Sequence, residues 1–282
     1  ISGELRILAC TTAFGMGING LRPVIEIQFA DYIFPAYDQI VNEMAKIRHR
    51  SGGEFWCPVT IRTPAGGGIR GGHHHSQSPE SQFTHTPGLK VVYCSTPYNA
   101  KGLLISAIED NDPVIFFEPK RCYRGPFYGD PHNVPTWSDH PEAEVPESHY
   151  KIPLGDARLA IEGDGCTVIS WGAMVHVCEQ AIKDSGVSCD LIDLQTLVPW
   201  DVETVVKSVT KTGRCVIVHE APKTSGFGAE MAASIQERCF WNLESPIERV
   251  TGWDTPFPHT TEWDYMPGPD RVIEAIVRTQ EN

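Results

Sequence analysis

A glycine-rich stretch that runs into three histidines carries the clearest chemistry in this chain. Residues 66–80 read Gly-Gly-Gly-Ile-Arg-Gly-Gly-His-His-His-Ser-Gln-Ser-Pro-Glu. Glycines let a backbone pass close to a ligand and adopt positive φ without strain. Pro79 suits the first turn of a helix, with Ser78 as its cap and Glu80 beside the positive end of the dipole. The stretch therefore predicts a loop that presents one imidazole at the edge of a cleft, as a catalytic acid or base is presented.

Two other interpretations of the three histidines are weaker. A purification tag is terminal and usually longer than three residues. A metal site is disfavoured because adjacent side chains diverge and no Cys or Asp pattern completes a ligand set. A structural or solvated role stays open for any one of them.

Composition limits the class of protein. The chain has 282 residues, a formal net charge of −13 and 41% hydrophobic residues, as in a soluble globular protein of about two domains. The negative charge argues against nucleic acid or an anionic membrane as the main partner, and no apolar run is long enough to span a bilayer. The nine cysteines form no Cys-x-x-Cys pair, so we expect reduced, mostly buried thiols. No signal peptide is visible at Ile1.

Strand and helix patterns alternate twice along the chain, which predicts two parallel, doubly wound sheets. Apolar runs predict strands at 23–29, 59–62, 89–94, 114–118, 166–171, 189–194, 215–219 and 247–250. Helical periodicity is expected at 35–50, 98–109, 173–183, 201–212 and 227–239. Residues 121–153 are rich in Pro, His, Gly and acidic residues and predict a long connection.

One apparent cofactor motif is a decoy. Gly163-Asp164-Gly165 resembles the start of the diphosphate and magnesium motif of thiamine enzymes, but no Asn follows before Asn242. We expect a turn before a strand instead. No Walker-type Gly-Lys-Ser/Thr motif occurs in the sequence, and no Gly-x-Gly-x-x-Gly directly follows a predicted strand.

Several longer motifs resemble the beta subunit of the thiamine-dependent 2-oxo acid dehydrogenases, over nearly the whole chain. They are Glu-Ile-Gln-Phe-Ala-Asp-Tyr-Ile-Phe-Pro at 26–35, His-Ser-Gln-Ser-Pro-Glu at 75–80, Phe-Phe-Glu-Pro-Lys at 116–120, His-Glu-Ala at 219–221 and Asp-Thr-Pro-Phe-Pro at 254–258. The second and third motifs, with the insert at 121–153, look like the branched-chain (2-oxoisovalerate) members rather than the pyruvate members.

The resemblance implies an α/β protein with two doubly wound domains. A thiamine-diphosphate-binding (pyrimidine) fold, N-terminally incomplete at 1–125, is followed by a connecting segment at 126–153 and a transketolase C-terminal-like domain at 154–282. It also implies an α2β2 heterotetramer with a second beta subunit, an alpha subunit that holds the diphosphate and Mg²⁺, and a lipoyl-bearing transacylase as further partner. The compartment would be the bacterial cytoplasm or the mitochondrial matrix.

The resemblance also assigns roles to individual residues. Glu4 would be the carboxyl that hydrogen-bonds the aminopyrimidine of thiamine diphosphate, with a pKa raised in an apolar interface. Tyr32 and Gln28 would line the pyrimidine pocket. His75 would be the acid or base that assists acyl transfer to the lipoyl arm. A structural K⁺ is implied as well, held mainly by carbonyl oxygens of Cys57, Val59, Thr60, Ala107, Asp110 and Asp112.

Other functions stay open at this stage. A pyruvate or acetoin dehydrogenase beta subunit would share most of these motifs. A non-catalytic assembly module is favoured by the segment from Leu5 to Thr12, which lacks the glycines that follow the family's glutamate. Ser2-Gly3-Glu4 would then be a frayed terminus, and Tyr32 would be core filler.

Overall fold

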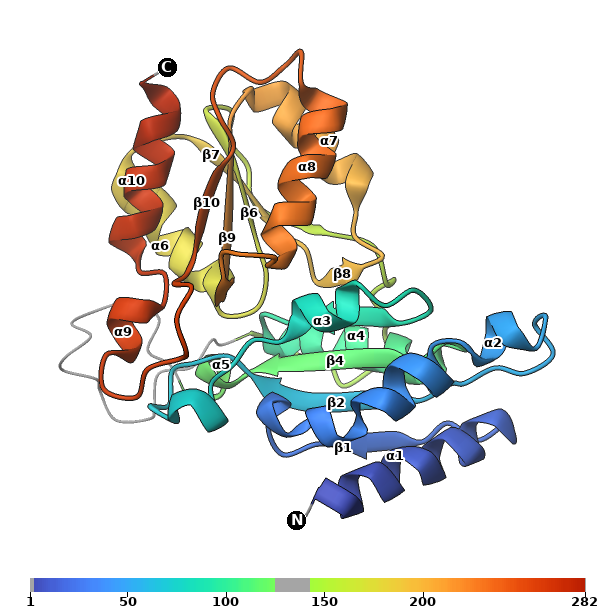
Figure 1. The fold of residues 1–282 in the computed structure, drawn as a ribbon. Helices are drawn as coiled ribbons and strands as arrows, with labels where there is room; N and C mark the ends of the chain where they lie inside the picture. The colour runs from blue at the N-terminus through green and yellow to red at the C-terminus, as the bar shows by residue number, and fades with distance from the viewer. Residues whose placement is uncertain (1–2, 125–142, 282) are drawn as a thin grey trace.

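The structure is a computed structural model that describes residues 3–124 and 143–281. It consists of two α/β domains, the first at the bottom and the second at the top of Figure 1. The first sheet has the order β1-β2-β4-β3-β8 and is parallel except for its last strand. Its strands are β1 (Val24–Glu26), β2 (Thr60–Ala65), β3 (Lys90–Tyr93), β4 (Val114–Pro119) and β8 (Thr196–Val198).

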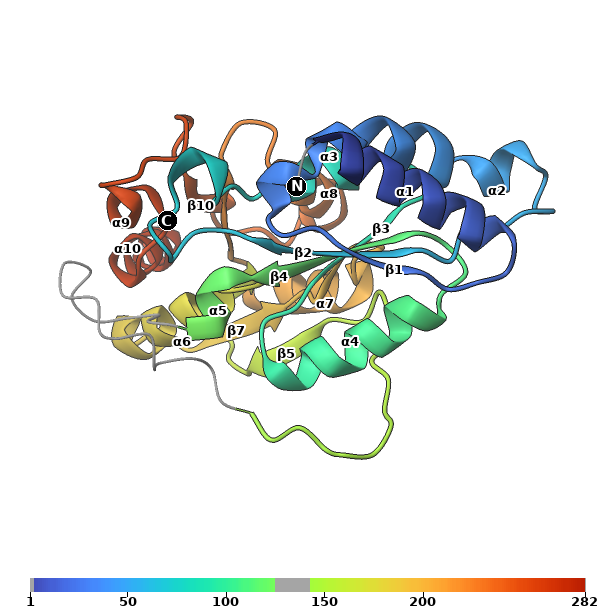
Figure 2. The ribbon, with the colours of Figure 1, turned by 90° about the horizontal axis from the view of Figure 1, so that it is seen from below.

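Helices cover both faces of the first sheet, as Figure 2 shows. One face carries α1 (Gly3–Ile18) and α3 (Glu80–Thr84), and the other carries α4 (Pro97–Glu109) and α5 (Lys120–Arg124). Helix α4 starts at a complete capping box between Thr96 and Asn99, which satisfies its first free amides. The carboxyl ends of the parallel strands therefore meet at one edge, where loops that carry functional side chains gather.

The predicted helix at 35–50 is wrong in detail. The structure has η2 (Phe34–Ala36), a π-helix η3 (Gln39–Met44) and α2 (Ile47–Arg50) in its place. The predicted apolar face is confirmed, because Ile40 and Met44 are fully buried in the core. The sequence pattern thus gives the buried face correctly but not the wider winding that local packing imposes.

Two further expectations about the first domain are corrected. The predicted buried strand at 23–29 is a short edge strand, β1, in which Val24 and Glu26 are exposed and only Ile25 faces the core. Helix α3 begins at Glu80 with Pro79 as its N-cap residue, and no side chain caps it. Ser78 is therefore not the cap.

The second sheet has the order β10-β9-β6-β7-β5, with only the edge strand β5 antiparallel. Its strands are β5 (Arg158–Ile161), β6 (Cys166–Ser170), β7 (Cys189–Asp193), β9 (Cys215–Pro222) and β10 (Glu248–Gly252). Its helices are α6 (Met174–Ser185), α7 (Val202–Thr212), α8 (Phe227–Cys239), α9 (Glu262–Tyr265) and α10 (Pro269–Gln280). Helices α6 and α10 cover one face and α7 and α8 the other (Figure 1). The predicted strands and helices of this half are confirmed to within a few residues.

The two domains are joined by a shared core and by a buried polar network. The largest apolar cluster includes residues of both domains, such as Phe83, Phe117, Trp171 and Ile217. Strand β8 follows β7 of the second sheet and pairs with β3 of the first, although no sequence pattern predicted it.

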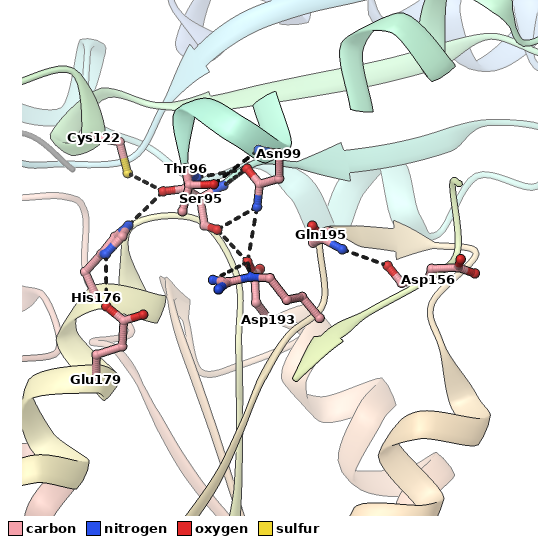
Figure 3. Close-up of polar contacts among 10 residues, drawn as sticks. Ser95, Thr96, Asn99, Cys122, Asp156, His176, Glu179, Asp193 and Gln195 are labelled. Atoms are coloured by element: carbon pink, nitrogen blue, oxygen red, sulfur yellow. Dashed lines mark hydrogen bonds and ion pairs between the residues drawn. The ribbon is translucent and has the colours of Figure 1, made fainter. Parts of the chain in front are cut away.

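Asp193 is the centre of the polar network at the junction (Figure 3). It is fully buried, and one carboxylate oxygen accepts hydrogen bonds from Ser95 Oγ at 2.5 Å, Asn99 Nδ2 at 3.2 Å and Arg158 Nη2 at 3.2 Å. Burial raises the pKa of this carboxyl. The network fixes the start of α4 against the second domain.

The cysteines are reduced and mostly buried, as predicted. All nine cysteines are free thiols, and all except Cys122 are buried, which confirms the prediction.

Within residues 3–124 and 143–281, no helix has the length and apolar character needed to cross a bilayer. The predicted connection at 121–153 begins with part of α5, and its residues 125–142 lie outside the described part of the chain.

Candidate active site

Tyr32 and His75, two of the predicted site residues, are in direct contact. The Tyr32 hydroxyl and His75 Nε2 are 2.8 Å apart and share a hydrogen bond. Tyr32 ends the short helix η1 (Ala30–Tyr32), which follows β1, and His75 follows η4 (Gly72–His74) in the glycine-rich loop. Both residues are only partly buried. The fold thus places an acid–base group and a phenol at the carboxyl edge of the first sheet.

Phe29 completes an aromatic corner around this pair. Its ring meets the His75 ring edge to face at 4.7 Å between centroids and the Tyr32 ring at 5.9 Å. The Lys120 ammonium lies 5.2 Å from the centre of the same Phe29 ring. Lys120 is 3% exposed, and burial lowers the pKa of its ammonium to about 8. The imidazole is therefore oriented by two rings and a hydrogen bond rather than free to rotate.

The loop that carries His75 is fixed by buried carboxylates from the second domain. Glu220 on β9 accepts a hydrogen bond from the Gly67 amide at 2.8 Å. Glu262 on α9 accepts from the Gly68 amide at 2.9 Å and from the Arg70 amide at 3.1 Å. Burial raises the pKa of both carboxyls, although the amides that they accept oppose this rise. We call these two side chains and the three amides the carboxylate latch.

Glycine is required at positions 66 and 68, where the loop backbone lies closest to Glu220 and Arg121. Gly66 has φ +80°, and a Cβ there would lie 2.5 Å from Glu220 Oε2. Gly68 has φ +100°, and a Cβ there would lie 2.8 Å from the Arg121 Cβ. The glycines predicted to let the backbone approach a ligand instead let it approach two carboxylates and an arginine.

Glu80 is a second buried carboxyl behind the loop. It is 1% exposed and accepts one hydrogen bond, from Trp171 Nε1 at 3.3 Å. Burial raises its pKa to about 8. The Trp171 ring stacks at 5.2 Å on His219, whose pKa burial lowers to about 4. These groups lie in the interior between the domains and are uncharged near neutral pH.

The raised pKa of Glu80 predicts that stability falls as pH rises. The folded chain holds the Glu80 proton up to about pH 8, whereas the unfolded chain loses it near 4.5. Between pH 6.5 and 8, Glu80 alone should lower the free energy of unfolding by about 1–2 kcal/mol. His219 at the lower limit and Lys120 at the upper limit offset part of this fall, because burial lowers their pKa values. Glu80→Gln should flatten this slope in denaturant titrations. An unchanged slope in the variant would show that Glu80 does not hold its proton.

The hydrogen bond to His75 predicts a modest role for the Tyr32 hydroxyl. Tyr32→Phe removes one partner of His75 Nε2 and leaves the aromatic corner in place. We expect turnover to fall by about 3–10-fold, the cost of one hydrogen bond, with a shift in the pH–rate profile. A pH–rate profile of the variant identical to that of the unmodified enzyme would contradict this role.

The other two residues predicted to bind the cofactor, Gln28 and Glu4, have no described contact with Tyr32 or His75. Gln28 is exposed in the segment between β1 and η1, and no hydrogen bond within the described residues ties it to Tyr32 or His75. Glu4 belongs to α1, but its side chain lies outside the described part. Figure 1 shows the N-terminal end of α1 at the same side of the domain as the carboxyl ends of β2 and β4.

The residues predicted to hold K⁺ lie close together, and several of their oxygens already have partners within the chain. The Val59 carbonyl accepts from the Val114 amide at 2.9 Å, and the Asp110 carbonyl accepts from Arg22 at 2.7 Å. The Asp112 carboxylate pairs with Arg48 at 2.7 Å. Further carbonyl contacts are Cys57 with the Val59 amide and Ala107 with the Asp110 amide. Among the six predicted ligands, the buried Thr60 hydroxyl has no hydrogen-bond partner within the described residues. The potassium site stays a prediction.

Sequence reasoning missed most of the groups that support His75. Phe29, Lys120 and Glu220 lie inside the motifs that carried the family resemblance but were not assigned roles. Glu262 had no sequence signal, because it is 194 residues from the amide that it accepts. A glutamate at the end of an apolar strand, as in Cys-Val-Ile-Val-His-Glu at 215–220, is the signal that could have found Glu220.

Two family models match the chain. The transketolase pyrimidine binding domain matches residues 8–126, and the transketolase C-terminal domain matches residues 155–272. A solved split-gene transketolase, described as an inactive beta4 tetramer, superposes with a TM-score of 0.75 at 19% identity, covering 98% of this chain and 81% of that one. This structural likeness supports the fold.

Curated relatives are much more similar in sequence. The 2-oxoisovalerate dehydrogenase subunit beta of Pseudomonas aeruginosa is 56% identical, over 95% of this chain and 77% of its own. The mitochondrial 2-oxoisovalerate dehydrogenase subunit beta of Dictyostelium discoideum is also 56% identical, over 95% of this chain and 70% of its own. A pyruvate dehydrogenase E1 component subunit beta from Acholeplasma laidlawii is 43% identical, over 94% and 78%. With both transketolase-type domains present, the chain belongs to the family of 2-oxoisovalerate dehydrogenase beta subunits.

Proposed function

We propose that this chain, with an alpha subunit, catalyses the thiamine-diphosphate-dependent oxidative decarboxylation of branched-chain 2-oxo acids and the reductive acylation of a lipoyl group. The family is thiamine-diphosphate-dependent, and its relatives are named as subunits of a larger enzyme. The single observation that carries the proposal is the 2.8 Å contact between Tyr32 and His75 at the carboxyl edge of the pyrimidine-binding domain.

The residues present suit the organic half of the cofactor. An aromatic corner with one imidazole and one exposed amide, Gln28, offers stacking and hydrogen-bonding groups at the same edge. Glu4 would supply the carboxyl to the aminopyrimidine from the N-terminal end of α1. When bound, thiamine diphosphate supplies the electron sink for the carbanion that decarboxylation leaves.

His75 would act in the acyl-transfer half of the reaction. When the lipoyl disulfide opens, one sulfur bonds to the acyl carbon and the other leaves as a thiolate. His75 would give a proton to the leaving sulfur, so the disulfide is reduced as the carbon left by decarboxylation is oxidised to an acyl group. Tyr32 orients the imidazole through Nε2, and the carboxylate latch holds the loop in place.

Other parts of the site would come from partners. Within the described residues, no group of three or more His, Cys, Asp or Glu side chains is placed to hold a metal ion. We infer that the alpha subunit holds Mg²⁺ and the diphosphate, in an α2β2 heterotetramer that includes a second beta subunit. The lipoyl-bearing transacylase would be the acceptor of the acyl group.

The domain division belongs to the same proposal. Residues 1–125 would form the pyrimidine-binding domain and 154–282 the C-terminal domain, joined by 126–153. The location would be the bacterial cytoplasm or the mitochondrial matrix, the two settings that the named relatives suggest.

Cofactor binding by the assembled enzyme tests this proposal. The chain is co-expressed with a cognate alpha subunit, and thiamine diphosphate with Mg²⁺ is titrated by calorimetry. We expect stoichiometric binding to the complex and none to either subunit alone. A complex that forms but binds no thiamine diphosphate would contradict the proposal and favour a non-catalytic assembly module.

A further inference from the structure

The C-terminal end of helix α4 is a place where the fold requires positive charge. The last carbonyls of a helix have no partner within the helix, and the dipole places partial negative charge there. Asp110 and Asp112 follow directly and add two carboxylates. A cation is therefore favoured at this corner, whether it is a metal ion or a side chain.

Arg22 already supplies that cation. Its Nη1 donates to the Ile108 carbonyl at 3.0 Å and to the Asp110 carbonyl at 2.7 Å, and its Nη2 donates to the Asn111 Oδ1 at 2.6 Å. The planar guanidinium offers several fixed donors, so one side chain satisfies three oxygens at once. The contacts tie together segments 86–89 residues apart in sequence.

The surrounding charges leave no need for a further cation. Lys90 Nζ is 2.6 Å from Asp110 Oδ2 and 3.5 Å from Asp112 Oδ2, and Arg48 is 2.7 Å from Asp112 Oδ1. Among the described residues of this corner, Lys90 and Arg48 thus face the two carboxylates, and Arg22 adds a third positive charge at the carbonyls. An added monovalent ion would meet net positive charge and carbonyls that are already engaged.

Arg22 also lies at a structurally useful position. The next residue, Pro23, accepts the Thr60 amide at 3.1 Å, and β1 begins immediately after it. Strand β1 leads into the segment that carries Phe29 and Tyr32. The contacts of Arg22 therefore fix the start of β1 relative to the C-terminal end of α4. The segment after β1 belongs to the candidate active site.

We infer that the guanidinium of Arg22 takes the place of a structural monovalent cation at the C-terminal end of α4. This chain then needs no bound K⁺ to hold β1 against α4. The inference stands on the contacts of Arg22 and does not depend on the proposed reaction.

Anomalous diffraction from the assembled complex tests the inference at the site itself. Crystals of the complex with its alpha subunit are grown or soaked in rubidium chloride, since Rb⁺ substitutes for K⁺ and scatters anomalously. We expect no anomalous peak within bonding distance of the Cys57, Val59 or Asp110 carbonyls. A peak there in the unmodified enzyme would overturn the inference.

A variant tests the structural role of the arginine. Arg22→Ala should lower the melting temperature of the complex by about 3 °C. Arg50→Ala is the matched control, because Arg50 also forms a 2.7 Å surface ion pair, with Glu43, but contacts no helix-end carbonyl, and it should change the melting temperature by less than about 1 °C. Equal shifts in the two variants would overturn the inference. If Arg22→Ala does not assemble, Arg22→Gln is measured with the same expectation.

Discussion

Replacing His75 with alanine in the assembled enzyme is expected to slow lipoyl acylation by about 10²–10⁴-fold, the usual contribution of a general acid or base. The imidazole is the titratable side chain that the loop presents at the sheet edge, oriented by Tyr32 and Phe29. Decarboxylation measured with an artificial electron acceptor should fall much less, because it does not require the lipoyl sulfur to be protonated. Stopped-flow comparison of the two half-reactions measures the difference.

The neighbouring histidine provides the control. His74 lies in η4 beside His73, with ring centroids 4.0 Å apart, and is exposed. His74→Ala should leave both half-reactions within about twofold of the unmodified enzyme, since exposed side chains contribute little to the folded site. Equal losses in both half-reactions for His75→Ala would show that its role is not confined to acyl transfer.

Replacing Glu262 with alanine is expected to give the second large effect. The substitution leaves the buried Gly68 amide and the part-buried Arg70 amide without their acceptor, and a buried unpaired group costs about 1–3 kcal/mol. The loop that carries His75 then loses one half of the carboxylate latch. We expect both a lower melting temperature and a lower rate of lipoyl acylation at saturating substrate.

Two further variants separate the latch from a general loss of charge. Asp264 lies on the same short helix, α9, but is exposed, so Asp264→Ala should have little effect on either property. Glu262→Gln keeps an oxygen acceptor and should recover part of both. If Glu262→Ala lowered stability while the acylation rate stayed normal, the latch would not position His75.

Local patterns explain why the arrangement of the fold was predictable. Strand β9 begins with the apolar residues Cys215–Val218, and α7 carries a clear helical periodicity, so both match the expected ranges closely. Strand β1 was overestimated because the mostly apolar stretch 23–29 does not show that the sheet pairs only three of its residues, at an edge. Strand β8 was missed because its pairing with β3 is decided by the docking of two domains.

In the candidate site, too, residues in local motifs were predictable and residues with distant contacts were not. Tyr32 and His75 were found because each belongs to a motif, and their contact follows from the meeting of loops at one sheet edge. Glu262 and Arg22 were not found, because each acts on backbone groups that are distant in sequence. The potassium site stays a prediction, and only the folded chain shows that Arg22 donates to the Asp110 carbonyl, one of its predicted ligands.

The measurement that tests the central claim most directly is turnover by the complex with its alpha subunit. Decarboxylation of 3-methyl-2-oxobutanoate is compared with that of pyruvate, each with and without thiamine diphosphate. We predict cofactor-dependent turnover that favours the branched substrate. A preference for pyruvate would make the chain a pyruvate-type beta subunit, and no turnover by a stable complex that binds the cofactor would contradict the proposed catalytic role.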